Sequence, residues 1–151
     1  TVTAIMAERA LYLGGRHLHY LFCIPADNTT NIHKVIDQSI RGLNRNPERL
    51  QFLRTLDVML IDEAGYMSAN LLNITDTVLR KIRGKSAFMG GVLVIATIDD
   101  QQLPPVKAKP FLISSLIPTS FEMVALEYSV RARTDILLQR IINISRKIIL
   151  L

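Results

Sequence analysis

Residues 57–63 are Asp-Val-Met-Leu-Ile-Asp-Glu. The apolar run Val58 to Ile61 stops abruptly at two adjacent carboxylates, Asp62 and Glu63. A short apolar run without polar alternation predicts a strand that is buried on both faces, as strands of parallel sheets are. Val92 to Thr97 is a second run of this kind, and Phe121 to Leu126 predicts a third strand. Segments with helical spacing lie between and around these runs. The chain is therefore expected to adopt an α/β fold, with a mostly parallel sheet flanked by helices.

Apolar periodicity and end signals also predict where the helices lie. Helices are expected over residues 3–13 and 31–43, between Ser68 and Gly84, and from Thr134 onward. Ser68 is a good N-cap residue, and Met67 and Leu72 are spaced as a hydrophobic staple around it. Gly84 follows a basic last turn and provides a C-terminal stop. Residues 44–48 are expected to form a loop.

The composition excludes several classes of site. Of the 151 residues, 49% are hydrophobic and 21% are charged, which suits one domain with a substantial core. A single cysteine excludes an internal disulfide and a multi-cysteine metal site, and the three histidines have no zinc-ligand spacing. No apolar stretch has the length of about 18 residues that a membrane span needs. The net charge of +5 suits a polyanionic partner but equally suits an ordinary solvated surface.

Two further features bear on the parent protein and on its compartment. It begins with Thr1 and shows no signal-like segment, so we expect an internal piece of a longer protein. One cysteine fits a reducing, intracellular compartment, which is the nucleus or mitochondrion in a eukaryote and the cytoplasm in a bacterium.

Polar side chains follow two of the predicted strands directly. Asp62 and Glu63 follow the first strand, and Asp99 and Gln102 follow the second. Ligands of open α/β sheets bind at the carboxyl ends of strands, so these groups are expected to share one crevice. There Asp62 would hold Mg²⁺, Glu63 would activate a water, and Gln102 would hydrogen-bond a terminal phosphate. The alternative stays open, because strands often end in carboxylates simply where they reach water.

Residues 84–86, Gly-Lys-Ser, resemble the end of a phosphate-binding loop. The full motif requires a glycine at position 79, which is Leu79. The tripeptide also follows a predicted helix, whereas a phosphate loop follows a strand. The 151 residues therefore contain no complete phosphate-loop motif.

Several segments, in this order, carry a family resemblance. They are Thr3-Ala4, Leu13-Gly14-Gly15-Arg16-His17-Leu18-His19-Tyr20-Leu21-Phe22, Leu60-Ile61-Asp62-Glu63, Arg80-Lys81-Ile82-Arg83, Phe88-Met89-Gly90-Gly91-Val92, Gln102-Leu103-Pro104-Pro105-Val106 and Leu126-Glu127-Tyr128-Ser129-Val130-Arg131. Together they resemble the first RecA-like motor domain of the Pif/RecD-like DNA helicases of superfamily one. The resemblance implies that residues 1–126 are a RecA-like P-loop NTPase domain without its N-terminal phosphate loop. Residues 127–151 would be the motif IV region and the start of the connection to the second motor domain.

The resemblance assigns roles around ATP and Mg²⁺. Asp62 and Glu63 are similar to the magnesium-binding and water-activating carboxylates of motif II. Asp99 and Gln102 are similar to motif III, which couples the γ-phosphate to DNA. Arg131 resembles the motif IV arginine that reaches the terminal phosphate, and Arg133 is an alternative to it.

The resemblance also assigns contacts with single-stranded DNA. Thr3 and residues 15–22 are similar to motif Ia and its extension, which places Thr3, His19 and Phe22 at the DNA. For His19 and Phe22, core packing is an equally good interpretation. The family pattern has glycine where this chain has Ala7 and Ile98, and an apolar-serine pair where it has Ala64-Gly65.

The resemblance implies a fragment of an ATP-dependent DNA helicase that moves 5′ to 3′ on single-stranded and duplex DNA. Without the phosphate loop, residues 1–151 alone are expected to be inactive. Two alternatives remain: another P-loop ATPase, or a degenerate nucleic-acid-binding module derived from a mobile element. The oligomeric state is not predicted.

Overall fold

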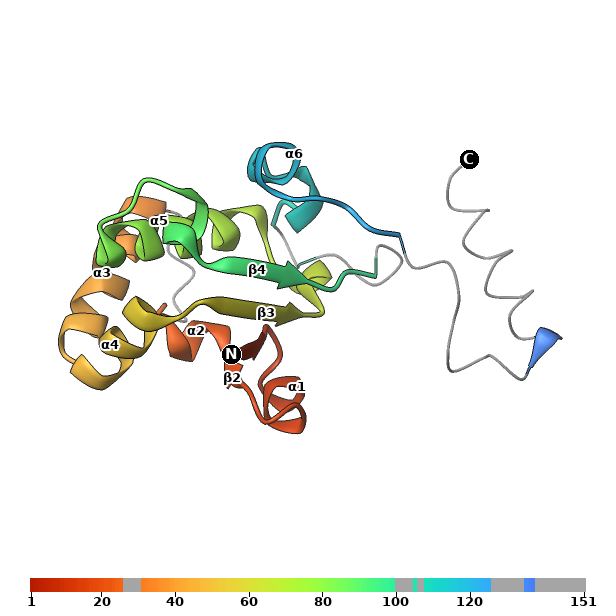
Figure 1. The fold of residues 1–151 in the computed structure, drawn as a ribbon, viewed down its shortest axis with the longest axis horizontal. Helices are drawn as coiled ribbons and strands as arrows, with labels where there is room; N and C mark the ends of the chain where they lie inside the picture. Colours follow the sequence, from red (N-terminus) through yellow and green to blue (C-terminus); the bar gives the residue numbers. More distant parts are fainter. Residues whose placement is uncertain (26–30, 100–104, 106–107, 126–134, 138–151) are drawn as a thin grey trace. The chain divides into compact units, whose positions relative to one another are not determined.

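The computed structural model describes residues 1–25, 31–99, 105, 108–125 and 135–137 (Figure 1). The chain forms two units, Thr1–Ser120 and Phe121–Leu151, and every helix and strand named below belongs to the first. Within the described ranges, no helix combines the length and the apolar character needed to cross a bilayer.

The first unit is built on a sheet of four parallel strands in the order β2-β1-β3-β4. The strands are β1 (Val2–Ala4), β2 (Arg16–His17), β3 (Val58–Asp62) and β4 (Leu93–Ala96). In the register, Ala4 lies opposite Asp62, and Ile61 lies opposite Ala96. All four strands therefore end at the same edge of the sheet. The expected parallel α/β arrangement is confirmed.

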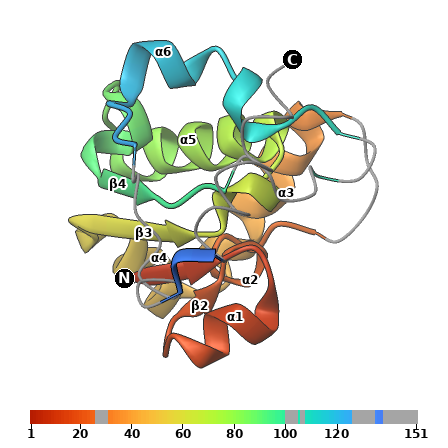
Figure 2. The same cartoon turned by 90° about the vertical axis from the view of Figure 1, so that its right-hand side faces the viewer.

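Helices connect the strands and pack on one another (Figure 2). The helices are α1 (Ala7–Tyr12), α2 (Leu18–Leu21), α3 (Ile32–Asn44), α4 (Pro47–Thr55), α5 (Ala69–Arg83) and α6 (Leu116–Ser120). Short 3-10 turns are η1 (Ala64–Tyr66), η2 (Phe88–Gly91) and η3 (Phe111–Ile113). The longest helix, α5, packs against both α3 and α4.

Helix α5 begins and ends where its sequence predicts. The Ser68 side chain accepts a hydrogen bond from the Leu71 N–H at 3.1 Å, and the flanking Met67 and Leu72 are fully buried. Gly84 ends the helix in the left-handed conformation, with φ +63°. Its buried face includes Leu71, Ile74, Val78 and Ile82, which are three or four residues apart as one side of a helix requires.

The two faces of the sheet differ in how far their apolar side chains are buried. Met59 and Ile61, which alternate along β3 and so share one face, are fully buried. On the other face, Val58, Leu93 and Ile95 are 40%, 60% and 47% exposed. Val58 and Leu93 are register partners, so these apolar side chains form one continuous surface. The expectation that both strands are buried on both faces is wrong for this face.

Three other expectations need correction. The helix expected over residues 3–13 is instead β1 followed by α1, because Val2–Ala4 pair with β3. The loop expected at residues 44–48 is shorter, because Pro47 occupies the first turn of α4, where its missing N–H costs nothing. Residues 121–125 form no strand, since they have no strand partner within the described part of the chain. The helix expected from Thr134 lies almost wholly outside the described residues.

The turn before β4 is held by a buried carboxylate. Asp76 of α5 accepts hydrogen bonds from the Met89 N–H at 2.6 Å and from Arg80 Nε at 2.9 Å. Met89 and Gly90 both have positive φ angles, +50° and +61°. The helix thereby fixes a strained turn that aims β4 along β3.

Candidate functional site

Asp62 lies at the end of β3, with its side chain only 14% exposed. Thr97, the residue after β4, donates a hydrogen bond from Oγ1 to Asp62 Oδ1 at 2.7 Å. Arg9 of α1 donates from Nε to Asp62 Oδ2 at 2.6 Å. The end of β3 and the segments that follow its two neighbours, β1 and β4, therefore meet at this one carboxylate.

Glu63 occupies the left-handed region, with φ +53° and ψ +45°. Its N–H donates to Thr97 Oγ1 at 3.1 Å, and the next N–H, from Ala64, donates to the Thr97 carbonyl at 2.8 Å. A non-glycine residue with positive φ is uncommon and needs support of this kind. Arg9 Nε lies 3.8 Å from Glu63 Oε1, so one guanidinium lies beside both carboxylates.

The electrostatics of Asp62 reflect these contacts. Partial burial alone would raise the pKa of Asp62, but hydrogen bonds from Thr97 and Arg9 and the positive charge of Arg9 hold it below its ordinary value of 3.8. The hydrogen bond and charge of Asp62 raise the pKa of Arg9 in turn. Asp62 is therefore an anion over the whole neutral range and is available to a cation.

Asp99 reaches the same edge of the sheet, as the sequence predicts. A Cβ placed on Gly65 would lie 3.3 Å from the Asp99 carbonyl oxygen and 4.0 Å from Ile98 Cγ2. The glycine that departs from the family pattern thus lets the segment after β4 approach the turn after β3. Pro104, Gln102, Arg131 and its alternative Arg133 lie outside the described residues.

The three predicted DNA-contact residues differ in how far they are buried. Thr3 is fully buried and donates from Oγ1 to the Leu60 carbonyl at 3.0 Å. Phe22 is also fully buried, so neither side chain has surface on which to contact DNA directly. His19 is half-buried and stacks on His17, with ring centroids 5.2 Å apart. For Phe22, the structure favours core packing over base contact.

Exposed aromatic side chains lie nearby instead. Tyr12 of α1 is 81% exposed and Tyr20 of α2 is 63% exposed. Each has a guanidinium over its ring: Arg9 at 5.6 Å from the centroid of Tyr12 and Arg49 at 4.0 Å from that of Tyr20. Rings held in this way present flat surfaces to solvent.

Sequence reasoning missed two members of the site. Thr97 had a usable signal, since it ends an apolar run and lies at the strand edge beside Asp62. Arg9 had none, because 53 residues separate it from Asp62 and only the pairing of β1 with β3 brings α1 to the carboxylate.

The donor set at this edge suits Mg²⁺ better than zinc. The described residues contain no cluster of three or more histidine, cysteine, aspartate or glutamate side chains that would cage a metal. Mg²⁺ is instead held by one or two carboxylates, with phosphates and waters completing its coordination. Asp62 and Glu63 supply such a pair.

Known proteins resemble this chain in sequence and in fold. The ATP-dependent DNA helicase RRM3 of Saccharomyces cerevisiae is 32% identical over 108 residues, which cover 72% of this chain and 14% of that protein. The crystal structure of Pif1 helicase from Candida albicans matches with a TM-score of 0.70 and 24% identity, over 81% of this chain and 28% of that one. Bacteroides Pif1 bound to single-stranded DNA matches with a TM-score of 0.54 and 26% identity, over 70% of this chain and 24% of that one.

The chain spans 10% to 21% of the length of the curated relatives it matches. The family described as PIF1-like helicase matches residues 2–133, which is most of the chain. The protein therefore belongs to the PIF1-like helicase family.

Proposed function

We propose that the chain is part of the first motor domain of an ATP-dependent DNA helicase. Family membership supports the proposal, as does the name of the yeast relative, an ATP-dependent DNA helicase. The observation that carries it is the pair Asp62 and Glu63 at the carboxyl end of β3, where Thr97, the residue after the neighbouring strand β4, hydrogen-bonds to both residues. Open α/β sheets bind their ligands at this edge.

Each carboxylate would have its own task. Mg²⁺ bound with ATP would neutralise the charge that develops on the transferred phosphoryl group. Asp62, kept anionic by its low pKa, would hold that ion through water, and Thr97 would keep its Oδ1 oriented. Glu63 would accept a proton from the attacking water. Arg9, which donates to Oδ2 of the same carboxylate, would keep Asp62 in position.

Three other residues complete the proposed site. Asp99, already beside the turn after β3, and Gln102 would contact the γ-phosphate and report its loss to the DNA. Arg131 would stabilise negative charge on the terminal phosphate. These roles rest on the family pattern around each residue.

Single-stranded DNA would lie over the same edge of the sheet, and the match to a structure of Bacteroides Pif1 bound to single-stranded DNA supports DNA as the partner. Among the described residues, the exposed rings of Tyr12 and Tyr20 and the half-buried ring of His19 would stack on bases where the strand passes α1 and α2, and such stacking tolerates any sequence. Thr3 and Phe22 would support this surface from beneath, through packing. Movement 5′ to 3′ and unwinding of duplex DNA belong to the same proposal.

The remaining parts of the motor would come from outside these 151 residues. The open sheet face around Val58, Leu93 and Ile95 is the surface on which such elements would pack. The phosphate loop would be among them. We propose that residues 1–126 belong to the first motor domain and 127–151 to the link that follows. The 151 residues alone are then expected to hydrolyse no ATP.

The test is Glu63→Gln in the longer protein that contains this chain. DNA-stimulated ATP hydrolysis should fall by at least about 100-fold, the contribution of a general base, while binding to single-stranded DNA stays within about twofold of wild type. Glu48→Gln, an exposed change on α4, is the matched control and should keep full activity. A strand-displacement assay with 5′ and 3′ tails tests the polarity. Undiminished hydrolysis by Glu63→Gln contradicts the proposal.

A non-catalytic nucleic-acid-binding module is the second candidate. The Arg9–Asp62 ion pair favours it, because the carboxylate is neutralised without a metal ion. Under this candidate, the longer wild-type protein binds DNA but hydrolyses no ATP at any Mg²⁺ concentration. DNA-stimulated hydrolysis by the wild type excludes it.

A further inference from the structure

A cavity of about 430 Å³ lies at the C-terminal end of α5, away from the candidate site. Its lining is Arg54, Lys81, Ile82, Arg83, Gly84 and Lys85. Arg83 donates to the carbonyl of Leu56, which precedes β3, so the cavity lies beside the start of that strand. Asp62 lies at the opposite end of β3, and the strand's five residues separate the two by roughly 16 Å.

The guanidinium groups of two arginines donate hydrogen bonds to the backbone carbonyls around this cavity. Arg83 donates to four carbonyls at 2.8–2.9 Å, those of Leu53, Arg54, Leu56 and Gly90. Arg54 donates from Nε to the Ile82 carbonyl at 3.1 Å. A helix C-terminus normally repels anions through its free carbonyls and its dipole. Here the two arginines cover carbonyl groups at the ends of α4 and α5.

The positive charge in the cavity is largely uncompensated. Within the described part of the chain, no carboxylate oxygen lies within 4.0 Å of the charged nitrogens of Arg54, Arg83 or Lys85. Lys81 has one contact, to Asp37 of α3, at 4.0 Å, and both side chains are more than half exposed. An exposed pair at that distance contributes little. The cavity is therefore lined by four cationic side chains, and those of Arg54, Lys81 and Lys85 are exposed to solvent.

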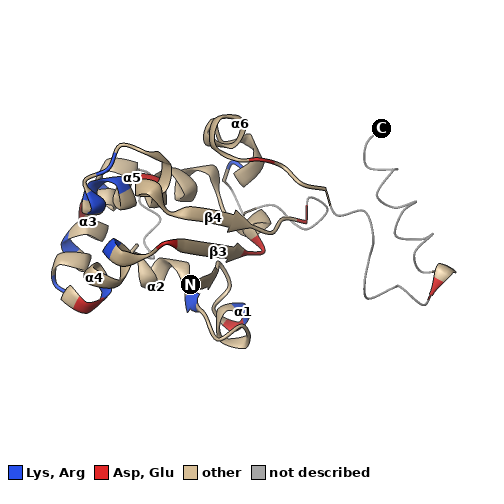
Figure 3. Cartoon of the chain, in the orientation of Figure 1, with Lys and Arg blue, Asp and Glu red and all other residues tan. Residues whose placement is uncertain are grey.

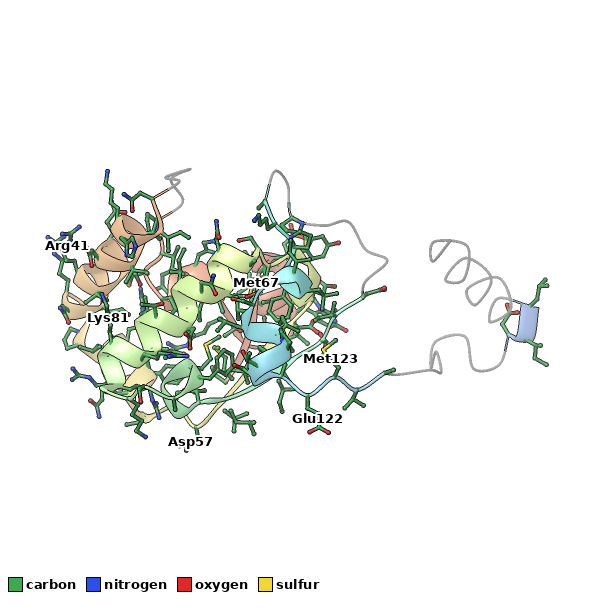
Figure 4. All side chains as sticks on the ribbon, turned by 90° about the horizontal axis from the view of Figure 1, so that it is seen from above. Arg41, Asp57, Met67, Lys81, Glu122 and Met123 are labelled. Atoms are coloured by element: carbon green, nitrogen blue, oxygen red, sulfur yellow. The ribbon has the colours of Figure 1, made fainter. Side chains whose placement is uncertain are left out.

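The charge continues beyond the cavity. Residues 31–57 and 80–85 carry nine lysine and arginine residues against three acidic ones, and one of the nine, Arg80, is paired with the buried Asp76. Figure 3 shows these cations on α3, α4 and the last turns of α5, and Figure 4 shows Arg41 and Lys81 at the same end of the unit as Asp57. The basic surface faces away from the strand ends that carry Asp62.

We propose that the α5 cavity binds a phosphate group of a nucleic-acid backbone, as a second contact separate from the strand-end DNA surface. Lys85, exposed and lying along Gly91, and Lys81 contact the phosphate, while Arg54 and Arg83 keep the cavity in shape. A row of cations over three helices suits an extended polyanion better than a single small ion. The proposal goes beyond the proposed helicase function and does not depend on ATP.

The test combines two probes with two matched variants of the 151-residue chain. Lys85→Glu reverses a charge in the cavity, and Lys109→Glu reverses a charge at the N-terminal end of α5, where the Lys109 carbonyl accepts from Ala69 N–H at 2.9 Å. Binding of a fluorescent oligothymidine of about 20 nucleotides is measured from about 50 to 200 mM salt. Lys85→Glu should weaken binding at least about fivefold and lower the salt slope by about one, as the loss of a phosphate contact does. Lys109→Glu should change the affinity less than about twofold.

Asp37→Asn should have the opposite effect on affinity to Lys85→Glu. It removes the carboxylate beside Lys81 and should tighten oligonucleotide binding about twofold. Amide NMR spectra separate the two sources of phosphate: the oligonucleotide should shift the Arg83, Lys85 and Gly91 signals at micromolar concentration, whereas inorganic phosphate should need millimolar concentration. Equal effects of Lys85→Glu and Lys109→Glu would overturn the proposal, as would shifts confined to α1 and α2. Shifts with inorganic phosphate but none with the oligonucleotide would overturn the nucleic-acid assignment. Far-UV circular dichroism verifies that each variant is folded.

Discussion

Arg9 Nε lies 2.6 Å from Oδ2 of Asp62, so a cation from α1 already occupies one of the two oxygens of the carboxylate proposed to hold Mg²⁺. The other oxygen is bound to Thr97. In this state each oxygen of Asp62 accepts one hydrogen bond and keeps a further lone pair, to which a metal-bound water can donate. The ion pair keeps Asp62 charged and oriented in the meantime, which is a form of preorganisation.

Replacing Arg9 by Gln should raise the pKa of Asp62 toward its ordinary value of 3.8, because a hydrogen bond and a positive charge are lost. A carboxylate with a lowered pKa stabilises the fold above its unfolded-state value, and this contribution is lost as the pH falls through the lowered pKa. The variant should therefore lose less stability than wild type between pH 3.8 and the lowered pKa. Carboxyl-carbon NMR titration and urea unfolding measure the two effects. Arg41→Gln, exposed on α3, is the control; an unchanged Asp62 pKa in Arg9→Gln contradicts the interpretation.

Replacing Thr97 by Val should destabilise the turn after β3 by about 1 kcal/mol. The hydroxyl both donates to Asp62 and accepts from the Glu63 N–H, and valine of similar shape does neither. Thr97→Ser keeps the hydroxyl and should recover most of the loss. Chemical denaturation measures the stability, and the chemical shift of the Glu63 amide proton reports the hydrogen bond. If valine and serine are equally stable, the hydroxyl does not hold this turn.

His19 should make the chain less stable in mild acid. Burial, together with the nearby His17, lowers the pKa of His19 below its ordinary value of 6.5. The unfolded chain therefore binds the proton first, and the contribution of His19 is full above pH 6.5 and is lost as the pH falls toward the lowered pKa. Its buried Nδ1 finds no hydrogen-bond partner among the described residues.

Urea midpoints at about pH 7.5 and 5.5 measure this effect on either side of the histidine titration range. His19→Asn should reduce the difference between them. His33→Asn, an exposed change on α3, should keep the wild-type difference. Equal pH dependence in His19→Asn and wild type would show that His19 is not the group responsible.

Gly90 and Gly84 should respond differently to alanine. Both have positive φ, +61° and +63°, so each substitution costs about 1 kcal/mol in backbone strain. A Cβ on Gly84 meets no atom within 4 Å, whereas a Cβ on Gly90 would lie 2.8 Å from the Leu79 carbonyl oxygen. Gly90→Ala should therefore cost about 1–3 kcal/mol more. Thermal unfolding of the two variants side by side gives the difference, and equal losses contradict the close approach.

Local signals predicted much of the fold. The limits of α5 follow from Ser68 and Gly84, and the covered face of β3 follows from an apolar run. Both depend on residues a few positions apart, which a sequence displays directly. The second helix of the α3–α4 pair was missed because its mean pattern is polar and weakly periodic, even though Pro47 marks its first turn.

The sequence predicted only part of the candidate site. Asp62, Glu63 and Asp99 follow strands, and strand ends lie at one edge of a parallel sheet, so the approach of the Asp99 backbone to the turn after β3 was predictable. The burial of Phe22 was not, because a helix of four residues carries too little periodicity to show which side faces the core. The tertiary fold instead exposes Tyr12 and Tyr20, whereas it buries Phe22.

By itself, the sequence determined that this chain forms a parallel α/β sheet with two carboxylates at the end of a buried strand, since strand runs, caps and strand ends are local patterns. Only the tertiary structure decided that Val2–Ala4 pair with β3, that Arg9 meets Asp62 across 53 residues, and that cations from α3, α4 and α5 gather on one surface. Each of these depends on contacts between segments far apart in the chain, and their free energy comes from packing that no single segment contains.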